Sequence, residues 1–218
     1  MTPTPLISET HPARPRARLY RPGEPFGTEE LQGLTAQGAL RHLLGDVYIP
    51  RTLPLGPEVR AQAVSTLLSP ADRTNVVICG ELAGWIHIGA PAPRRLTLIC
   101  SGFRRRRRRD VLDRQSHDVH LEETDICTLG PLQVTTPART AADTFLGIGT
   151  TISTGPLHPG HDDQRRVELV GTVMSVFADE AAPKRVEDVI ALQRDRRGAT
   201  VDRAAIAEVL QACIQQCD

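Results

Sequence analysis

The amino-acid sequence predicts an α/β (α+β) protein, and two features lead to that prediction. Short runs of aliphatic and β-branched residues, Val76–Cys79 and Arg95–Cys100, have the length and composition of buried strands. Helical patterns bounded by Pro and Gly lie between such runs and fill the chain after residue 165. We therefore expect a small mixed β-sheet with helices, preceded by a small N-terminal subdomain and followed by a helical C-terminal tail.

The N-terminal part of the chain divides into an arm and a subdomain. Residues 1–25 are rich in Pro, Thr and Arg without periodicity, which predicts a disordered arm. Within 26–54 we expect a short helix that Gly33 ends and a second helix that Thr35 caps and that runs to Leu44. The next run, D-V-Y-I-P-R, alternates like an edge strand. This order predicts a reduced, winged-helix-like unit whose first helix is absent or irregular.

Residues 55–147 predict a mixed α/β domain, and its clearest element is V-T-T-P-A-R-T-A-A-D-T-F-L. Thr136 is a good helix N-cap, and Pro137 at the first helical position loses no hydrogen bond, so a strand should pass here into a helix. Arg139 and Asp143 are four residues apart, which predicts an ion pair on the helix surface. Further strands are expected at Val119–Glu122 and Leu132–Thr135.

The last third of the chain changes from loop to helix. Residues 148–164 predict a loop because they are rich in Gly and polar residues. The C-terminal region, 165–218, predicts three helices, over 165–179, 186–194 and 201–217.

Composition favours a soluble globular protein with a polyanion-binding half. The chain is 40% hydrophobic, has no apolar run long enough to span a bilayer, and lacks a leader-like segment, so we expect it in the cytoplasm. Its five cysteines are irregularly spaced and imply no disulfide framework. The net charge is zero, but 17 Arg stand against 10 Asp and Glu through Arg114, and the balance reverses afterwards. The first half is therefore a candidate for binding nucleic acid.

Four segments in a fixed order resemble a known family. They are E-E-L-Q-G-L-T-A-Q-G-A-L-R-H-L-L-G-D-V-Y-I-P, then V-V-I-C-G-E-L-A-G-W-I-H-I-G, R-L-T-L-I-C and L-G-P-L-Q-V-T-T-P-A-R-T-A-A-D. The chain resembles the AbiEi-type antitoxin and transcriptional-regulator family of type IV toxin–antitoxin systems, in its actinobacterial form without a nuclease-like C-terminal extension. The resemblance implies a winged helix-turn-helix followed by a mixed α/β domain. It also implies binding to promoter DNA of the protein's own operon and antagonism of a nucleotidyltransferase toxin without direct contact.

If the helix from Thr35 to Leu44 enters a major groove, its N-terminal half faces the bases. Thr35, Gln37 and Arg41 are then the candidate contacts, because Gln suits adenine and Arg suits guanine or phosphate. Arg51 in the wing, with Arg14, Arg16 and Arg18 in the arm, would reach phosphates or a minor groove. The alternative is a helical subdomain that packs on the body and leaves Arg41 in solvent.

A second candidate site is a run of six arginines. Six adjacent guanidinium groups repel one another, so the run predicts an exposed loop between strands that is either simply solvated or binds phosphates without sequence preference. The residues are Arg104, Arg105, Arg106, Arg107, Arg108 and Arg109.

Catalytic motifs are missing from the sequence. The one lysine, Lys184, follows A-A-P, so the acid-x-Lys element of restriction-type nucleases is missing, and no P-loop, G-x-S-x-G or H-E-x-x-H occurs. The least favoured hypothesis is a metal-dependent hydrolase using His158, His161, Asp162 and Asp163. We expect a non-catalytic DNA-binding regulator without cofactor or metal, and the alternative is a protein-interaction or scaffold module that keeps the fold without specific DNA binding.

Overall fold

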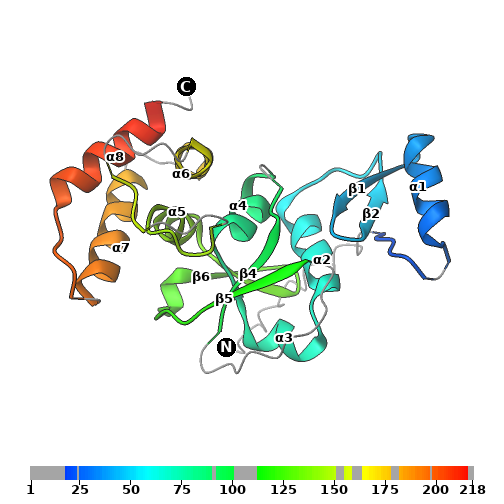
Figure 1. Ribbon diagram of the computed structural model, residues 1–218, viewed down its shortest axis with the longest axis horizontal. Coiled ribbons are helices and arrows are strands. Elements are labelled where there is room, and N and C mark those ends of the chain that lie inside the picture. The colour runs from blue at the N-terminus through cyan, green and yellow to red at the C-terminus, as the bar shows by residue number, and fades with distance from the viewer. Residues whose placement is uncertain are drawn as a thin grey trace, which may run out of the picture.

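The computed structural model of the chain consists of three parts arranged along its long axis (Figure 1). A helix–hairpin lobe lies at one end, an α/β body in the middle and a group of C-terminal helices at the other end. Most of the expected arm, 1–25, lies outside the described residues. The structure describes residues 18–23, 25–89, 92–100, 112–150, 155–158, 164–177, 182–196 and 198–215.

The lobe consists of one helix and a two-stranded hairpin. Helix α1 (Thr28–Ala36) begins after Gly27, whose N–H donates to the Glu30 carboxylate at 2.7 Å. Strands β1 (Leu40–Leu44) and β2 (Val47–Pro50) pair in antiparallel fashion. A single β-bridge from Tyr20 to Tyr48 adds the incoming chain to the free side of β2.

The expected second helix, Thr35–Leu44, is wrong, because Leu40–Leu44 is a strand. Leu40 and Leu44 are the buried ends of that strand, and a spacing of four places two side chains on one face of a helix and of a strand alike. Gly38, with φ of +76°, separates α1 from β1, and the turn at Gly45, with φ of +60°, folds β1 back onto β2. The chain therefore has no helix-turn-helix in this segment, which is a helix followed by a hairpin.

The body is built on a five-stranded mixed sheet in the order β5-β4-β3-β7-β6. The pairs β3–β4 and β6–β7 are antiparallel, and the pairs β3–β7 and β4–β5 are parallel. The mixed sheet expected from the sequence is therefore confirmed. The strands are β3 (Val77–Ile78), β4 (Arg95–Ile99), β5 (Asp113–His117), β6 (Ile126–Leu129) and β7 (Leu132–Thr135).

The strand expected at Val119–Glu122 is wrong, whereas the one at Leu132–Thr135 is confirmed. Residues 118–122 have no regular structure and lead into the short 3₁₀ helix η1 (Glu123–Asp125). Val119 and Leu121 still alternate toward the sheet, where they pack against Val77 and Ile99. The alternating pattern thus reflects packing on the sheet rather than pairing within it.

Helices α2 (Pro57–Leu67) and α4 (Gly80–Ile88) contribute to the core on the other face of the sheet, and α3 (Pro70–Asn75) lies beside it. Every residue of α4 from Gly80 to His87 is buried, because this helix also contacts α5 and α6. The backbone turns sharply from β3 into α4 at Gly80, whose φ is +53°. A Cβ atom there would lie 2.3 Å from the carbonyl oxygen of Gly149, so the close approach of these two segments requires glycine.

Helix α5 (Pro137–Phe145) links the body to the C-terminal helices. Thr136 caps it by accepting from the Arg139 N–H, as the sequence predicts. Its apolar side chains join a core cluster with the last three helices, α6 (Gln164–Phe177), α7 (Ala182–Arg196) and α8 (Arg203–Gln215). No helix in the described part of the chain is long and apolar enough to cross a membrane.

Candidate functional site

The structure places the predicted DNA-contact residues around the end of α1 and the start of the hairpin. Thr35 lies in the last turn of α1, where its hydroxyl donates to the Leu31 carbonyl, and Gln37 is the exposed C-cap. Both residues therefore lie at the C-terminal end of the lobe helix, not in the N-terminal half of a recognition helix as the sequence analysis expected. The first turn of α1 carries Glu29 and Glu30, whose charge repels phosphate.

Arg41 and Arg51 both bond to backbone carbonyls near the base of the hairpin. Arg41, in β1, donates from Nη2 to the Leu53 carbonyl at 2.6 Å, which ties it to the turn after β2. Arg51 is exposed, and its backbone N–H donates to the Ala39 carbonyl at 3.0 Å. That bond brings Arg51 next to the segment that connects Gln37 to β1.

The remaining basic and metal-competent candidates are only partly within the structure. Arg104 to Arg109, together with Arg14 and Arg16, lie outside the described residues. Arg18 is exposed, and its guanidinium carbon lies 6.0 Å from the centroid of the Tyr20 ring. Of the proposed metal loop, His158 is exposed, and the other three residues lie outside the described part. The described residues contain no group of three or more side chains able to hold a metal ion.

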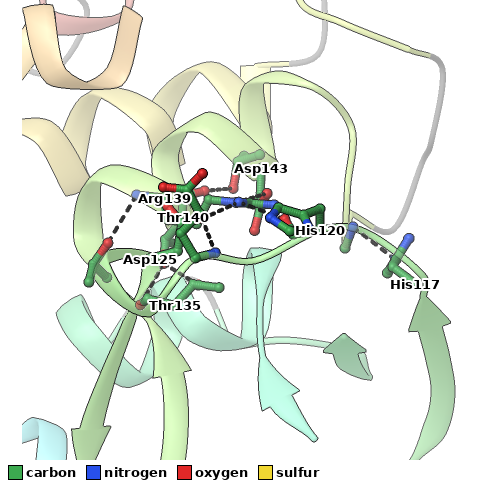
Figure 2. A network of polar contacts seen from close by, with 11 residues as sticks. His117, His120, Asp125, Thr135, Arg139, Thr140 and Asp143 are labelled. Carbon is green, nitrogen blue, oxygen red and sulfur yellow. Dashed lines mark hydrogen bonds and ion pairs between the residues drawn. The ribbon is translucent and has the colours of Figure 1, made fainter. Parts of the chain in front are cut away.

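The most developed polar centre in the body surrounds Arg139, which is fully buried (Figure 2). Its Nε donates to Asp143 at 2.8 Å, and its Nη1 donates to Asp125 at 2.7 Å and to the His120 carbonyl at 3.2 Å. The predicted surface pair of Arg139 and Asp143 is therefore wrong, because both side chains have no exposed area. The i,i+4 spacing gave the pairing correctly but does not reveal which face of the helix is covered.

This centre connects η1, the segment before it and α5. Asp125 on η1 accepts the Glu122 N–H as well as the Arg139 guanidinium, and its carbonyl accepts the Thr136 N–H at 2.8 Å. The hydroxyls of Thr135 and Thr140 bond each other at 2.7 Å (Figure 2). Arg139 is held by two carboxylates and a carbonyl, and this arrangement fixes the start of α5 against the sheet. Moving α5 would break these bonds and leave unpaired charges in the protein interior, which is costly.

The thiol nearest to this centre is not suited to nucleophilic chemistry. Cys79 stands at the N-cap of α4, a position that lowers the pKa of exposed thiols. Here burial raises the pKa of Cys79 well above its ordinary value, and the charge of Asp143 adds to the rise. The thiol therefore stays protonated at neutral pH and acts as a small apolar group.

Two other buried arginines cap helix C-termini. Arg60, on α2, donates to the carbonyls of Ile86 and His87 at the end of α4. Arg166, on α6, donates to the carbonyls of Thr144 and Phe145 at the end of α5. Each guanidinium satisfies carbonyls that the helix itself leaves without partners and places positive charge at the negative end of the helix dipole.

Glu81, in the first turn of α4, is buried. Its carboxylate accepts from Arg165 at 2.9 Å, which joins α4 to α6, and its backbone N–H donates to the Gly149 carbonyl. His87 is also buried, and its Nε2–H donates to the Thr135 carbonyl at 2.8 Å. These polar groups are structural connections within the body.

No family model, curated protein or solved structure matches this chain. What the chain does is therefore inferred from the chemistry of its own surfaces. Because the buried polar groups of the body described above are engaged internally, we take the exposed side chains of the lobe as the candidates for contact with another molecule.

Proposed function

We propose that the chain is a non-catalytic, DNA-binding transcriptional regulator of the antitoxin type that binds DNA through the lobe. The observation that carries the proposal is the backbone bond from Arg51 to Ala39, which holds the backbone of exposed Arg51 against the segment two residues after exposed Gln37. Neighbouring segments of the lobe therefore carry an amide that can contact adenine and a cation that can bind phosphate.

The position of α1 supports this proposal. The helix lies at the outer end of the molecule (Figure 1), and Leu31 is its one buried residue. A single exposed helix has a diameter that a B-DNA major groove accepts, and a hairpin beside it can contact the flanking backbone. Since the acidic first turn opposes phosphate, we propose that the C-terminal end of α1, with Gln32 and Gln37, faces the DNA.

The test uses the full chain and two fluorescent duplexes. One carries the sequence directly upstream of the coding region, and the other carries the same bases scrambled. Anisotropy titrations at several salt concentrations give the affinity and its salt dependence for each. We expect Arg51→Ala to weaken binding to both duplexes and to reduce the salt slope by about 1. Arg94→Ala is the matched control, because it removes one exposed arginine from the body rather than from the lobe.

Gln37→Ala tests sequence reading separately from charge. If Gln37 reads a base, its loss should reduce the preference for the upstream duplex by about five- to 150-fold, which corresponds to roughly 1–3 kcal/mol per base contact. Equal affinity for the two duplexes in the parent chain, or equal effects of Arg51→Ala and Arg94→Ala, would refute the proposal.

The second candidate is an interaction module that does not bind DNA, and one observation favours it. Arg41 and Arg21 both bond within the chain, to the Leu53 carbonyl and to Asp46, so the lobe presents fewer cations than its sequence suggests. On this hypothesis neither duplex is bound at moderate salt. A nucleotidyltransferase toxin as genetic partner belongs to the first proposal and is tested by co-expression of the neighbouring gene.

A further inference from the structure

A cavity of about 400 Å³ opens between the first turn of α5, the middle of α6 and the start of α7. Its walls come from side chains that are otherwise buried in the core, above all Val173, Met174 and Val186. Pro137 and Ala138 at the beginning of α5 line it as well. The volume lies at the lower end of the ~300–1,000 Å³ range of small-molecule sites.

Most of the lining is apolar, with Thr124, Thr136 and Arg185 as its polar side chains, so water against the aliphatic wall has few partners. An ordered water needs two to four polar partners, and aliphatic side chains provide none. An empty cavity of this size forfeits the dispersion contacts of every atom in its lining. A ligand with an apolar body would restore those contacts.

Two polar features at the cavity favour negative charge, and a third polar group, the Thr124 hydroxyl on η1, is neutral. Arg185 lines it from α7, and its guanidinium has five N–H donors, so it can bind a carboxylate while keeping another contact within the chain. The cavity also borders the first turn of α5, where the Thr136 hydroxyl oxygen accepts a hydrogen bond from the Arg139 N–H. The N–H of Ala138 belongs to the same turn and has no partner inside the helix.

We propose that this cavity binds a small organic carboxylate with an aliphatic tail. The tail lies against Val173, Met174 and Val186, and the carboxylate is held at the rim by Arg185. This site is separate from the lobe, so the inference does not depend on DNA binding.

The binding test uses octanoate below its aggregation concentration, with octan-1-ol and octylammonium as probes of equal tail length. Calorimetric titration of the full chain should give saturable, one-to-one binding of octanoate. Octan-1-ol should bind more weakly, and octylammonium should not bind, because Arg185 repels it. Saturable binding of octylammonium as tight as that of octanoate, or no saturable binding of octanoate, would overturn the proposal.

Variants locate the site. Arg185→Gln should weaken octanoate about tenfold while leaving octan-1-ol unchanged, since it removes one charge-assisted contact. Lys184→Gln is the matched control, because it removes a neighbouring charge on the same helix that does not line the cavity. Equal losses in the two variants would show that the charge acts from a distance and would overturn the assigned contact.

Filling the cavity tests its location independently of charge. Ala182→Leu and Ala138→Leu add volume from two different helices, α7 and α5, and each should abolish binding of octanoate and octan-1-ol. Because the added groups enter existing space, the unfolding temperature should not fall, which distinguishes occupation of the cavity from loss of the fold. Undiminished octanoate binding in both folded variants would place the ligand elsewhere and refute the proposal.

Discussion

Replacing Arg139 with methionine, which is similar in length and uncharged, tests the claim that its buried charge holds the body together. Arg139 and Asp143 have no exposed side-chain area, and Asp125 is 13% exposed. Removing the arginine leaves Asp143 as an uncompensated charge inside the protein, a change that costs about 3–5 kcal/mol. For a chain of this size such a loss lowers the unfolding temperature by roughly 6–20 °C.

The assay is thermal and urea unfolding followed by circular dichroism, with Arg196→Met as the matched control. Arg196 also pairs with a carboxylate, that of Glu122, but both partners are substantially exposed, so its loss should cost no more than about 1 kcal/mol. A double variant, Arg139→Met with Asp143→Leu, should recover at least half of the lost stability, because it removes the stranded charge as well. Equal effects of Arg139→Met and Arg196→Met, or no recovery in the double variant, would refute the reasoning.

Three further predictions concern the body and the lobe. Burial lowers the pKa of His87 below its ordinary value of 6.5, so as the pH falls His87 is protonated in the unfolded chain before it is protonated in the folded one. The free energy of unfolding should therefore decrease as the pH drops below about 6.5. Urea titrations of His87→Gln should show a smaller decrease. Gly80→Ala should cost about 3 kcal/mol or more, because its Cβ meets a backbone carbonyl at positive φ, whereas Gly33→Ala, in the open middle of α1, should stabilise the lobe by about 0.5–1 kcal/mol. Arg166→Met should cost about 1.5–3 kcal/mol because it removes charge-assisted bonds to the Thr144 and Phe145 carbonyls, which keep only their backbone donors, and hydrogen exchange should rise selectively at the end of α5.

The parts of the fold that the sequence predicts are those with strong local signals. Thr136 and Pro137 form a capped helix start regardless of what packs on the helix, and the start of α5 is where the sequence places it. The apolar runs that became β3 and β4 are too short for helices and rich in β-branched or aliphatic residues. Each of these elements could be recognised without knowledge of the rest of the chain.

The errors arise where two structures share one pattern. In L-R-H-L-L the buried leucines are four residues apart, which suits a helix and a strand equally, and pairing with Val47–Pro50 decides between them. The turn residues Gly45 and Asp46 between two apolar segments were a signal for a hairpin. Strand β5 has the polar sequence D-R-Q-S-H and is held by its pairing to β4, so no local pattern could reveal it.

The charge asymmetry of the sequence overstates the basic surface of the structure, and this bears on the proposed DNA contact. Arg60 binds backbone carbonyls in the interior, and Arg21 and Arg114 bind the carboxylates of Asp46 and Asp72. Their charges are neutralised or buried and release few counterions from DNA.

Within the described part of the lobe Arg18 and Arg51 are the exposed arginines, and the Arg21 side chain, although 37% exposed, is paired with Asp46. Two phosphate contacts correspond to a salt slope of only about −2. A steeper measured slope would therefore assign the excess to basic residues outside the lobe. A salt slope near about −2 combined with a preference for the upstream duplex would mean that the lobe is sufficient both for DNA affinity and for recognition of the base sequence.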